Sequence, residues 1–458
     1  MKKFILFLAG ILAAVTFASE ALALPLFARQ TGMECAACHF QHFPMLNAFG
    51  RAFKASGFTM MGVQGKVEGD NLSIPNTLNM AVLTTMGYSK NNADSAASEI
   101  ATFGATGSGV KTPADGAVYV PGTNGEFSLF VGGRVSENAG ALAELGMTTE
   151  NGAGAGLHSA KIPMLWNVAG DSRVGLVPYT TDGQGASYGY EVLNTGANAV
   201  HTMLFIGGDF NGSNAPILSA QQYIGTASAA TGAAFVFNNS GYFINMTKFS
   251  QMGPANLSGA GSAMTSTYLR AASTFDMGNW DTGIGIQSWS GHSTSLSFTD
   301  TADIGTGAVT VSPVAQLIDT KATAIDAQMQ GEFNKMPLGF YATYAKAPAP
   351  SGSYDNAYNS GGTASKSSVN FAAELGVIPE KATVGIAFRR GKSGGNLGSG
   401  IVGANDSDNA YLIEGSYKLA QNMLLNLTHT SQSGDYWSKA NSDTYGSKQT
   451  ILNLATIF

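Results

Sequence analysis

Apolar and polar side chains alternate along many segments between about residue 76 and the end of this chain. In one of them, positions 325–333, the apolar positions and the polar positions take turns without interruption: Ile325, Ala327, Met329, Gly331 and Phe333 against Asp326, Gln328, Gln330 and Glu332. Segments 383–389 and 411–419 show the same pattern. Successive side chains of a strand point to opposite faces, so this period of two predicts strands with one apolar and one polar face. A soluble β-sandwich shows the same alternation of apolar and polar residues, so the lengths of the connections are needed to distinguish it from a membrane barrel.

Short and long connections between these segments take turns along the chain. The short ones fall near 238–241, 276–279, 334–337, 379–381 and 419–422, and the long polar ones near 250–263, 291–318, 347–367, 391–407 and 432–447. Short turns at one end and long loops at the other are typical of transmembrane barrels, and a terminal aromatic residue, Phe458, fits that class. We predict an all-β, porin-like barrel over residues 76–458, with about 16 antiparallel strands and 18 possible, wide enough to enclose a channel. Region 172–193 is the doubtful part of the count.

The composition agrees with a membrane barrel. Charged residues make up 12 % of the chain, about half the usual share, whereas glycine reaches 58 residues and aromatics 10 %. No segment after the first 23 residues has the pattern of a spanning helix, although the mean hydropathy is +0.05. A secreted β-solenoid or adhesin shares some of this composition and is the alternative.

Residues 1–23 have the pattern of a secretory signal peptide. Lys2 and Lys3 precede an uncharged apolar run, and a small-x-small site ends at Ala23. Removing these residues takes away two lysines and Glu20, which changes the net charge from −6 to −7. A negative chain without a basic stripe argues against a nucleic-acid partner. Export and the barrel pattern together predict the bacterial outer membrane, with its lipid as a partner.

The only two cysteines lie in the sequence Cys35-Ala36-Ala37-Cys38-His39. This C-x-x-C-H pattern is typical of covalent haem attachment, in which each thiol adds to one vinyl group and the histidine ligates the iron. We therefore predict one haem c bound by Cys35, Cys38 and His39. A redox-active C-x-x-C pair is the alternative, but it normally begins a helix in a βαβ unit, and no such unit follows.

A small helical unit, residues 24–62, is expected around this motif. Pro44 suits the first turn of a helix and Gly57 suits its end. Leu46, Phe49 and Phe53 repeat between them at helical spacing, and Phe40 and Phe43 precede them. About 40 residues are marginal for independent folding, so these side chains are expected to pack against the haem.

The second axial ligand of the haem iron is open. Met60 and Met61 follow the helix and could fold over the other face, which makes them candidate metal ligands together with His39. They are equally consistent with a linker, which we expect at 63–75. His42 follows His39 by three residues, would point the same way on a shared helix, and is better suited to a propionate or to solvent.

Other chemistry in the sequence is sparse, and no catalytic acid–base set is predicted. Asp326, Glu332 and Glu414 fall on positions that face the lumen, where they either attract cations or simply provide solvated polarity.

The N-terminal sequence resembles one family closely. The resemblance lies in Pro25 to Gly32, in Cys35 to Pro44, and in Leu46 to Lys54. It is similar to the fused outer-membrane monohaem cytochrome c–porin proteins of iron-oxidising bacteria, and the match covers about residues 25–58. The resemblance implies a haem segment in or at the mouth of a barrel, and electron uptake from extracellular Fe(II).

The expected function is thus electron transfer across the outer membrane, from extracellular Fe(II) through the haem to a periplasmic c-type cytochrome. Such an iron oxidase needs close approach and a matched potential, so whether it counts as an enzyme is uncertain. Two alternatives remain: a conduit that exports electrons to an extracellular acceptor, and a porin or channel whose haem serves another purpose.

Overall fold

The computed structural model of the chain describes residues 25–70, 72–92, 116–122, 125–147, 156–195, 218–254, 263–302, 309–395, 403–435, 437 and 447–458. The predicted signal peptide, residues 1–23, lies outside them. No helix in these ranges is both long and apolar enough to cross a bilayer.

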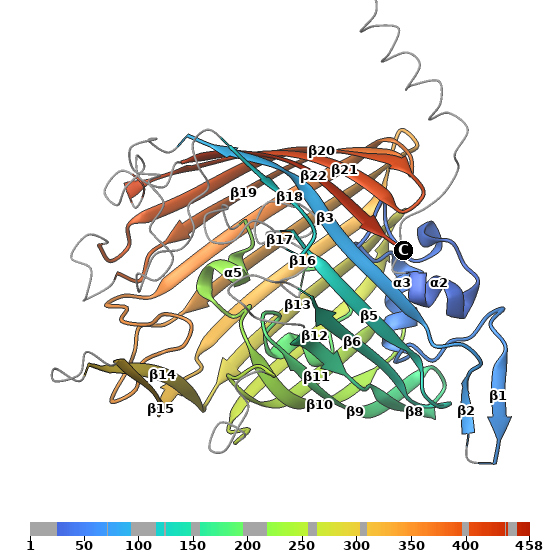
Figure 1. Cartoon of the computed structure of the whole chain (residues 1–458), viewed down its shortest axis with the longest axis horizontal. Helices are drawn as coiled ribbons and strands as arrows, with labels where there is room; N and C mark the ends of the chain where they lie inside the picture. Colours follow the sequence, from blue (N-terminus) through green and yellow to red (C-terminus); the bar gives the residue numbers. More distant parts are fainter. Residues whose placement is uncertain are drawn as a thin grey trace, which may run out of the picture.

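A closed antiparallel β-barrel forms the body of the molecule (Figure 1). Its first part contains β3 (Met80–Asn91), β4 (Ala117–Tyr119), β5 (Phe127–Arg134), β6 (Gly140–Gly146), β7 (Gly156–Lys161), β8 (Met164–Ala169) and β9 (Ser172–Thr181). The middle part contains β10 (Ala230–Asn238), β11 (Tyr242–Ser250), β12 (Ser266–Met277), β13 (Trp280–Ser290), β16 (Ala322–Phe333) and β17 (Met336–Ala347). The last part contains β18 (Lys366–Ile378), β19 (Ala382–Lys392), β20 (Ser407–Ala420), β21 (Met423–Ser433) and β22 (Lys448–Ile457).

These eighteen strands occupy sixteen positions around the wall. Strands β4 and β5 lie end to end along β3, and β7 and β8 lie end to end along β9. The last strand pairs with the first, from Gln449 against Asn91 to Ile457 against Leu83, and this pairing closes the barrel. The predicted porin-like barrel of about sixteen antiparallel strands is confirmed.

The connections follow the predicted alternation. The short turns 239–241, 278–279, 334–335, 379–381 and 421–422 lie at one end of the barrel, and the described parts of the long connections lie at the other. Asn334 and Lys335 both have positive φ, 50° and 65°, as the tightest hairpin turns require. A hairpin of β14 (His292–Ala302) and β15 (Val309–Asp319) belongs to the long connection between β13 and β16.

The two faces of the long wall strands differ as a membrane barrel requires. On β16, Ile325 is 61 % exposed on the outside, whereas the next residue, Asp326, is 2 % exposed on the inside. Ile286, Ile386 and Ile413 are exposed on the outer face to a similar extent. Apolar side chains that a soluble protein would bury therefore face outward, where lipid solvates them.

The connection after β9 enters the lumen. The doubtful region 172–193 divides into strand β9 and an inward segment with the short 3₁₀ helix η4 (Ala186–Gly189). The short helix α5 (Ala220–Ile224) returns the chain to the wall. Arg270 on β12 binds both Glu191 of this segment and Asp326 of β16, and all three side chains are at most 1 % exposed. The inward segment therefore fills this part of the lumen, within a barrel wide enough to enclose a channel.

The N-terminal segment lies at the end with the short turns, beside β3 and the C-terminus (Figure 1). It contains helix α2 (Pro25–Thr31), the 3₁₀ turn η1 (Cys35–Ala37) and helix α3 (Ala48–Ala55). Arg51 of α3 forms an ion pair with Asp281 at the start of β13, and the Gln41 side chain donates to the carbonyl of Pro337. The segment is thus held in the mouth of the barrel by strands far away in sequence.

The expected helix begins later than its proline suggests. Pro44 follows a cis peptide bond and lies outside the helix, and Asn47 is the N-cap, whose side chain accepts from the backbone N–H of Gly50 at 2.9 Å. Gly57, with φ of 74°, follows the end of α3 as predicted. The expected linker 63–75 contains a small hairpin, β1 (Lys66–Gly69) with β2 (Leu72–Pro75).

Candidate functional site

The motif residues share one tight turn after α2. The backbone N–H groups of Cys38 and His39 donate to the carbonyl of Cys35, at 3.0 and 2.8 Å. Both cysteines are free thiols, with Cys35 buried and Cys38 half-buried. Burial raises the pKa of Cys35 to about 12 and also raises that of Cys38. The turn therefore presents two protonated thiols and one imidazole within five residues.

The imidazole of His39 is held in one orientation. Its Nδ1 lies 3.1 Å from the carbonyl oxygen of Met45, which can only accept, so Nδ1 carries the proton and Nε2 keeps its lone pair. The ring of Phe43 contacts it edge-on, with ring centres 5.5 Å apart. Burial lowers the pKa of His39 to about 4 despite the opposing hydrogen bond to Met45. A neutral imidazole with an oriented second nitrogen is the form that binds metals.

A cavity of ≈ 400 Å³ lies between the N-terminal segment and the barrel wall. Cys35, Cys38 and His39 all line it. Apolar side chains from both sides make most of the remaining lining: Phe27, Phe43, Leu46, Phe53 and Phe58 from the segment, and Leu83, Phe130 and Leu142 from the wall. The sequence pattern indicated Phe43, Leu46 and Phe53, but it pointed neither to Phe27 and Phe58 nor to the residues of the wall.

Two predicted haem contacts are not at the cavity. Phe40 packs beside Met45 and Tyr341 instead, and Phe49, in the first turn of α3, is 38 % exposed.

Met60 and Met61 are also not among the residues that line the cavity. The side-chain amide of Gln30 donates to the carbonyls of Phe58 and Met60, at 2.7 and 2.8 Å, and the backbone N–H of Gly62 donates to the carbonyl of Gln30. These bonds fix the chain after Phe58 along the end of α2. Met33, which precedes the motif and was not considered from the sequence, does line the cavity.

Two lysines line the polar part of the cavity. Nζ of Lys161, on β7, donates to the carbonyl of Tyr188 at 3.0 Å and lies 4.1 Å from the centre of the Tyr188 ring. Lys54, from the last turn of α3, also lines the cavity, and burial lowers its pKa although Glu191 opposes the shift. Glu34, Glu126 and Glu144 line it as well, so the cavity has apolar walls with both basic and acidic side chains on its border.

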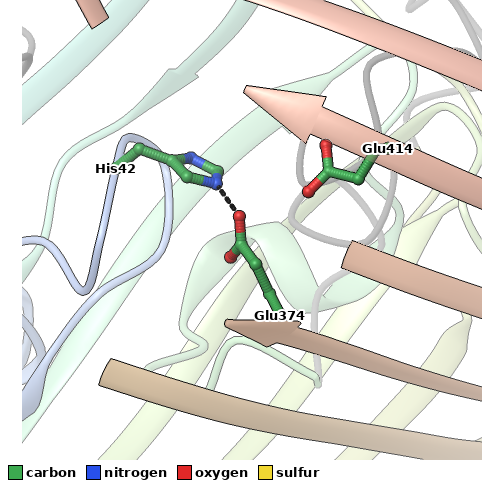
Figure 2. A group of neighbouring side chains, drawn as sticks. All are labelled: His42, Glu374 and Glu414. Carbon is green, nitrogen blue, oxygen red and sulfur yellow. Dashed lines mark hydrogen bonds and ion pairs between the residues drawn. The ribbon is translucent and has the colours of Figure 1, made fainter. Parts of the chain in front are cut away.

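His42 lies apart from this cavity in a second cluster, with Glu374 of β18 and Glu414 of β20 (Figure 2). The histidine shares no helix with His39, and because it is buried it is not the solvent-facing residue that was one of the two expectations, the other being a propionate partner. Its Nε2 lies 2.5 Å from Oε1 of Glu374. Burial lowers the pKa of His42, but the Glu374 carboxylate outweighs this effect with the help of other contacts and raises it to about 9.

The three carboxylates expected in the lumen have different environments. Asp326 is neutralised by Arg270, Glu332 is exposed, and Glu414 is buried in the cluster with His42. Solvated polarity therefore describes Glu332 alone.

The fold defines a porin-like transmembrane β-barrel with an N-terminal helical segment in one mouth. No protein-family model matches the sequence, and no curated protein matches it. Solved structures that resemble the chain include outer-membrane expressed OmpT of Vibrio cholerae, with 8 % identity and a TM-score of 0.43, covering 86 % of this chain and 100 % of that one. The outer membrane channel DcaP of Acinetobacter baumannii has 10 % identity and a TM-score of 0.48, covering 83 % and 97 %. Pseudomonas putida OprB has 10 % identity and a TM-score of 0.47, covering 83 % and 94 %.

Proposed function

We propose that this protein is an outer-membrane electron carrier with one covalent haem c in the mouth of its barrel. The observation that carries the proposal is the position of Cys35, Cys38 and His39 on the lining of one apolar cavity. Two thiols and an oriented imidazole are the groups that haem c attachment uses. A haem would supply one-electron oxidation and reduction at this place.

The residues around the cavity have distinct roles in this proposal. Cys35 and Cys38 would hold the porphyrin edge through thioether bonds, and Nε2 of His39 would ligate the iron. The aromatic side chains of the lining would exclude water from a bound ring, and such exclusion of water tunes a haem's potential. Lys54 and Lys161 would pair with the two propionates, since a buried carboxylate needs a cationic partner.

We further propose extracellular Fe(II) as the electron donor and a periplasmic c-type cytochrome as the acceptor. One electron leaves each Fe(II), which becomes Fe(III), and one electron reaches one acceptor haem. The short-turn end of such a barrel normally faces the periplasm, and the N-terminal segment lies at that end. The acceptor could therefore reach the haem without entering the lumen.

A porin or channel is the second candidate function, because a closed barrel of sixteen strand positions is wide enough to hold a pore. The segment with Glu191 fills part of this lumen, where it binds Arg270, so a pore would be narrower than the wall alone allows. A conduit that exports electrons to an extracellular acceptor, the other alternative, would use the same haem site with a lower haem potential.

The decisive experiment starts with full-length protein extracted from outer membranes. We expect haem that survives denaturing electrophoresis and acid–acetone extraction, and that is absent from the Cys35→Ser/Cys38→Ser variant. Fe(II) added to the oxidised protein should give the reduced haem spectrum. Protein without covalent porphyrin would contradict the proposal, and an open, selective pore in planar bilayers would favour the channel. Haem that Fe(II) cannot reduce would favour the export conduit.

A further inference from the structure

Three potential metal ligands converge inside the barrel, away from the motif. His42, Glu374 and Glu414 each offer a ligand atom, and these atoms lie within 4.8 Å of one another (Figure 2). The side chains come from the N-terminal segment and from two different strands, and all three are buried. We propose that they form a binding site for a divalent transition-metal ion, which fastens the N-terminal segment to the barrel wall.

Unpaired oxygens support this site. Oε2 of Glu374 and Oε1 of Glu414 are buried and have no hydrogen-bond partner within the described part of the chain. Glu374 is 0 % exposed and Glu414 is 7 % exposed. Oε2 of Glu414 accepts from Asn426 at 2.8 Å, so only one oxygen of that carboxylate is satisfied. Buried carboxylate oxygens without donors are costly, and a cation removes that cost.

A second carboxylate pair in the same lumen provides a comparison. Between Glu191 and Asp326 the chain inserts Arg270, which binds both. Between Glu374 and Glu414 the described residues place no arginine or lysine in ion-pair contact, and His42 pairs with Glu374 alone. Two carboxylates with one histidine leave an excess of negative charge, which a divalent ion would neutralise.

The strands leave space between the two carboxylates. Gly385 of β19 lies in register with Glu374 on one side and Glu414 on the other. A Cβ at this position would lie 2.7 Å from Oε1 of Glu414, so the glycine lets the carboxylate lean over β19. Without a side chain there, the two acids can approach one another.

The histidine is oriented as a ligand. Its Nδ1 donates to the carbonyl of Phe43 at 2.7 Å, and this bond directs Nε2 toward the carboxylates. One imidazole nitrogen with carboxylate oxygens suits Zn²⁺, Fe²⁺, Mn²⁺ or Co²⁺ better than Ca²⁺ or Mg²⁺, which take oxygen ligands. The competing account is a proton shared between Glu374 and Glu414, with no metal.

The test uses full-length protein in detergent, stripped with a chelator, with Co²⁺ as the probe. We expect one Co²⁺ per chain by equilibrium dialysis, visible absorption bands from the bound ion, and a higher Tm. Glu414→Gln and His42→Asn should each weaken binding at least about tenfold. Glu332→Gln, an exposed carboxylate on β16, is the matched control and should bind as the wild type does.

Three outcomes would overturn the site. Wild-type protein that binds no Co²⁺ would favour the shared proton, and then Glu414→Gln should keep its Tm, because the amide resembles a protonated acid. Binding that survives Glu414→Gln and His42→Asn would place the ion elsewhere. The Cys35→Ser/Cys38→Ser variant should still bind Co²⁺, and loss of binding there would assign the ion to the thiols. Because that variant carries no haem, the test is independent of the proposed electron transfer.

Discussion

Nδ1 of His39 lies 3.1 Å from the carbonyl oxygen of Met45, so the imidazole reaches back across the loop that follows the motif. The same loop contains the cis peptide before Pro44, and the carbonyl of Met45 also accepts from the backbone N–H of Phe40. The hydrogen bond to this loop therefore fixes the orientation of the His39 ring, with Nε2 directed away from Met45. The orientation of the proposed iron ligand depends on backbone that no motif describes.

The first prediction concerns this ligand. In His39→Ala the thioether bonds to Cys35 and Cys38 can still form, but the iron loses its axial nitrogen. We expect covalent haem with a midpoint potential changed by on the order of 100 mV, and partial recovery of the spectrum on addition of imidazole. His429→Ala is the control, because His429 lies on β21 and contacts Thr450. An unchanged potential in His39→Ala would exclude His39 as the ligand.

The second prediction concerns the attachment of the N-terminal segment. Arg51→Met removes the ion pair with Asp281 and the hydrogen bond to Gln330. Since Arg51 is 6 % exposed, the loss should destabilise the docked segment by about 3 kcal/mol. Limited proteolysis should then release the segment faster, while the barrel stays folded. Lys66→Met, which breaks the exposed pair with Glu68, should leave the cleavage rate unchanged.

The third prediction compares the effect of helix propensity with that of packing at Gly50 in α3. Alanine normally stabilises a helix relative to glycine by about 0.5–1 kcal/mol. At position 50, however, a Cβ would lie 2.0 Å from the carbonyl oxygen of Cys38, so α3 would have to move away from the motif. We expect Gly50→Ala to be destabilising by about 1–3 kcal/mol and to lower haem incorporation. A higher Tm would show that the close contact between α3 and the motif is absent. Ala52→Ser, on the exposed side of the same helix, is the control.

The fourth prediction tests the space over β19. Gly385→Ala places a methyl group against Glu414, whereas in Gly415→Ala the nearest atom to the new Cβ is 3.9 Å away. We expect the first variant to weaken Co²⁺ binding about tenfold and the second to leave it unchanged, measured by equilibrium dialysis. Equal Co²⁺ binding by both variants would mean that metal binding does not depend on the Glu414 side chain lying over Gly385.

Sequence patterns predicted the wall of the barrel well, because side-chain alternation and turn chemistry are local. The exposed Ile325 beside the buried Asp326 follows directly from a period of two, and the short connection predicted near 334–337 is the two-residue turn at Asn334 and Lys335. The strand count was uncertain in region 172–193, where β9 is followed by the segment that turns inward after Thr181.

The contents of the lumen could not be predicted in this way. His42 and Glu374 are 332 residues apart, and only the closed barrel brings them together. Leu83 and Phe130, which line the cavity from the wall, could not be identified either. The alternation of apolar and polar residues around them is the same as around apolar residues that face lipid. The helix start predicted from Pro44 was wrong, because Asn47, three residues later, is the N-cap of α3.

The contacts of Gln41, His42 and Arg51 have a consequence for the order of assembly. Their partners, Pro337, Glu374 and Asp281, follow them in the chain by 296, 332 and 230 residues. The N-terminal segment can therefore dock only after these strands have formed. Any large group bound covalently to Cys35 and Cys38 has to be attached before the segment docks, because the barrel wall then forms the other side of the cavity around it.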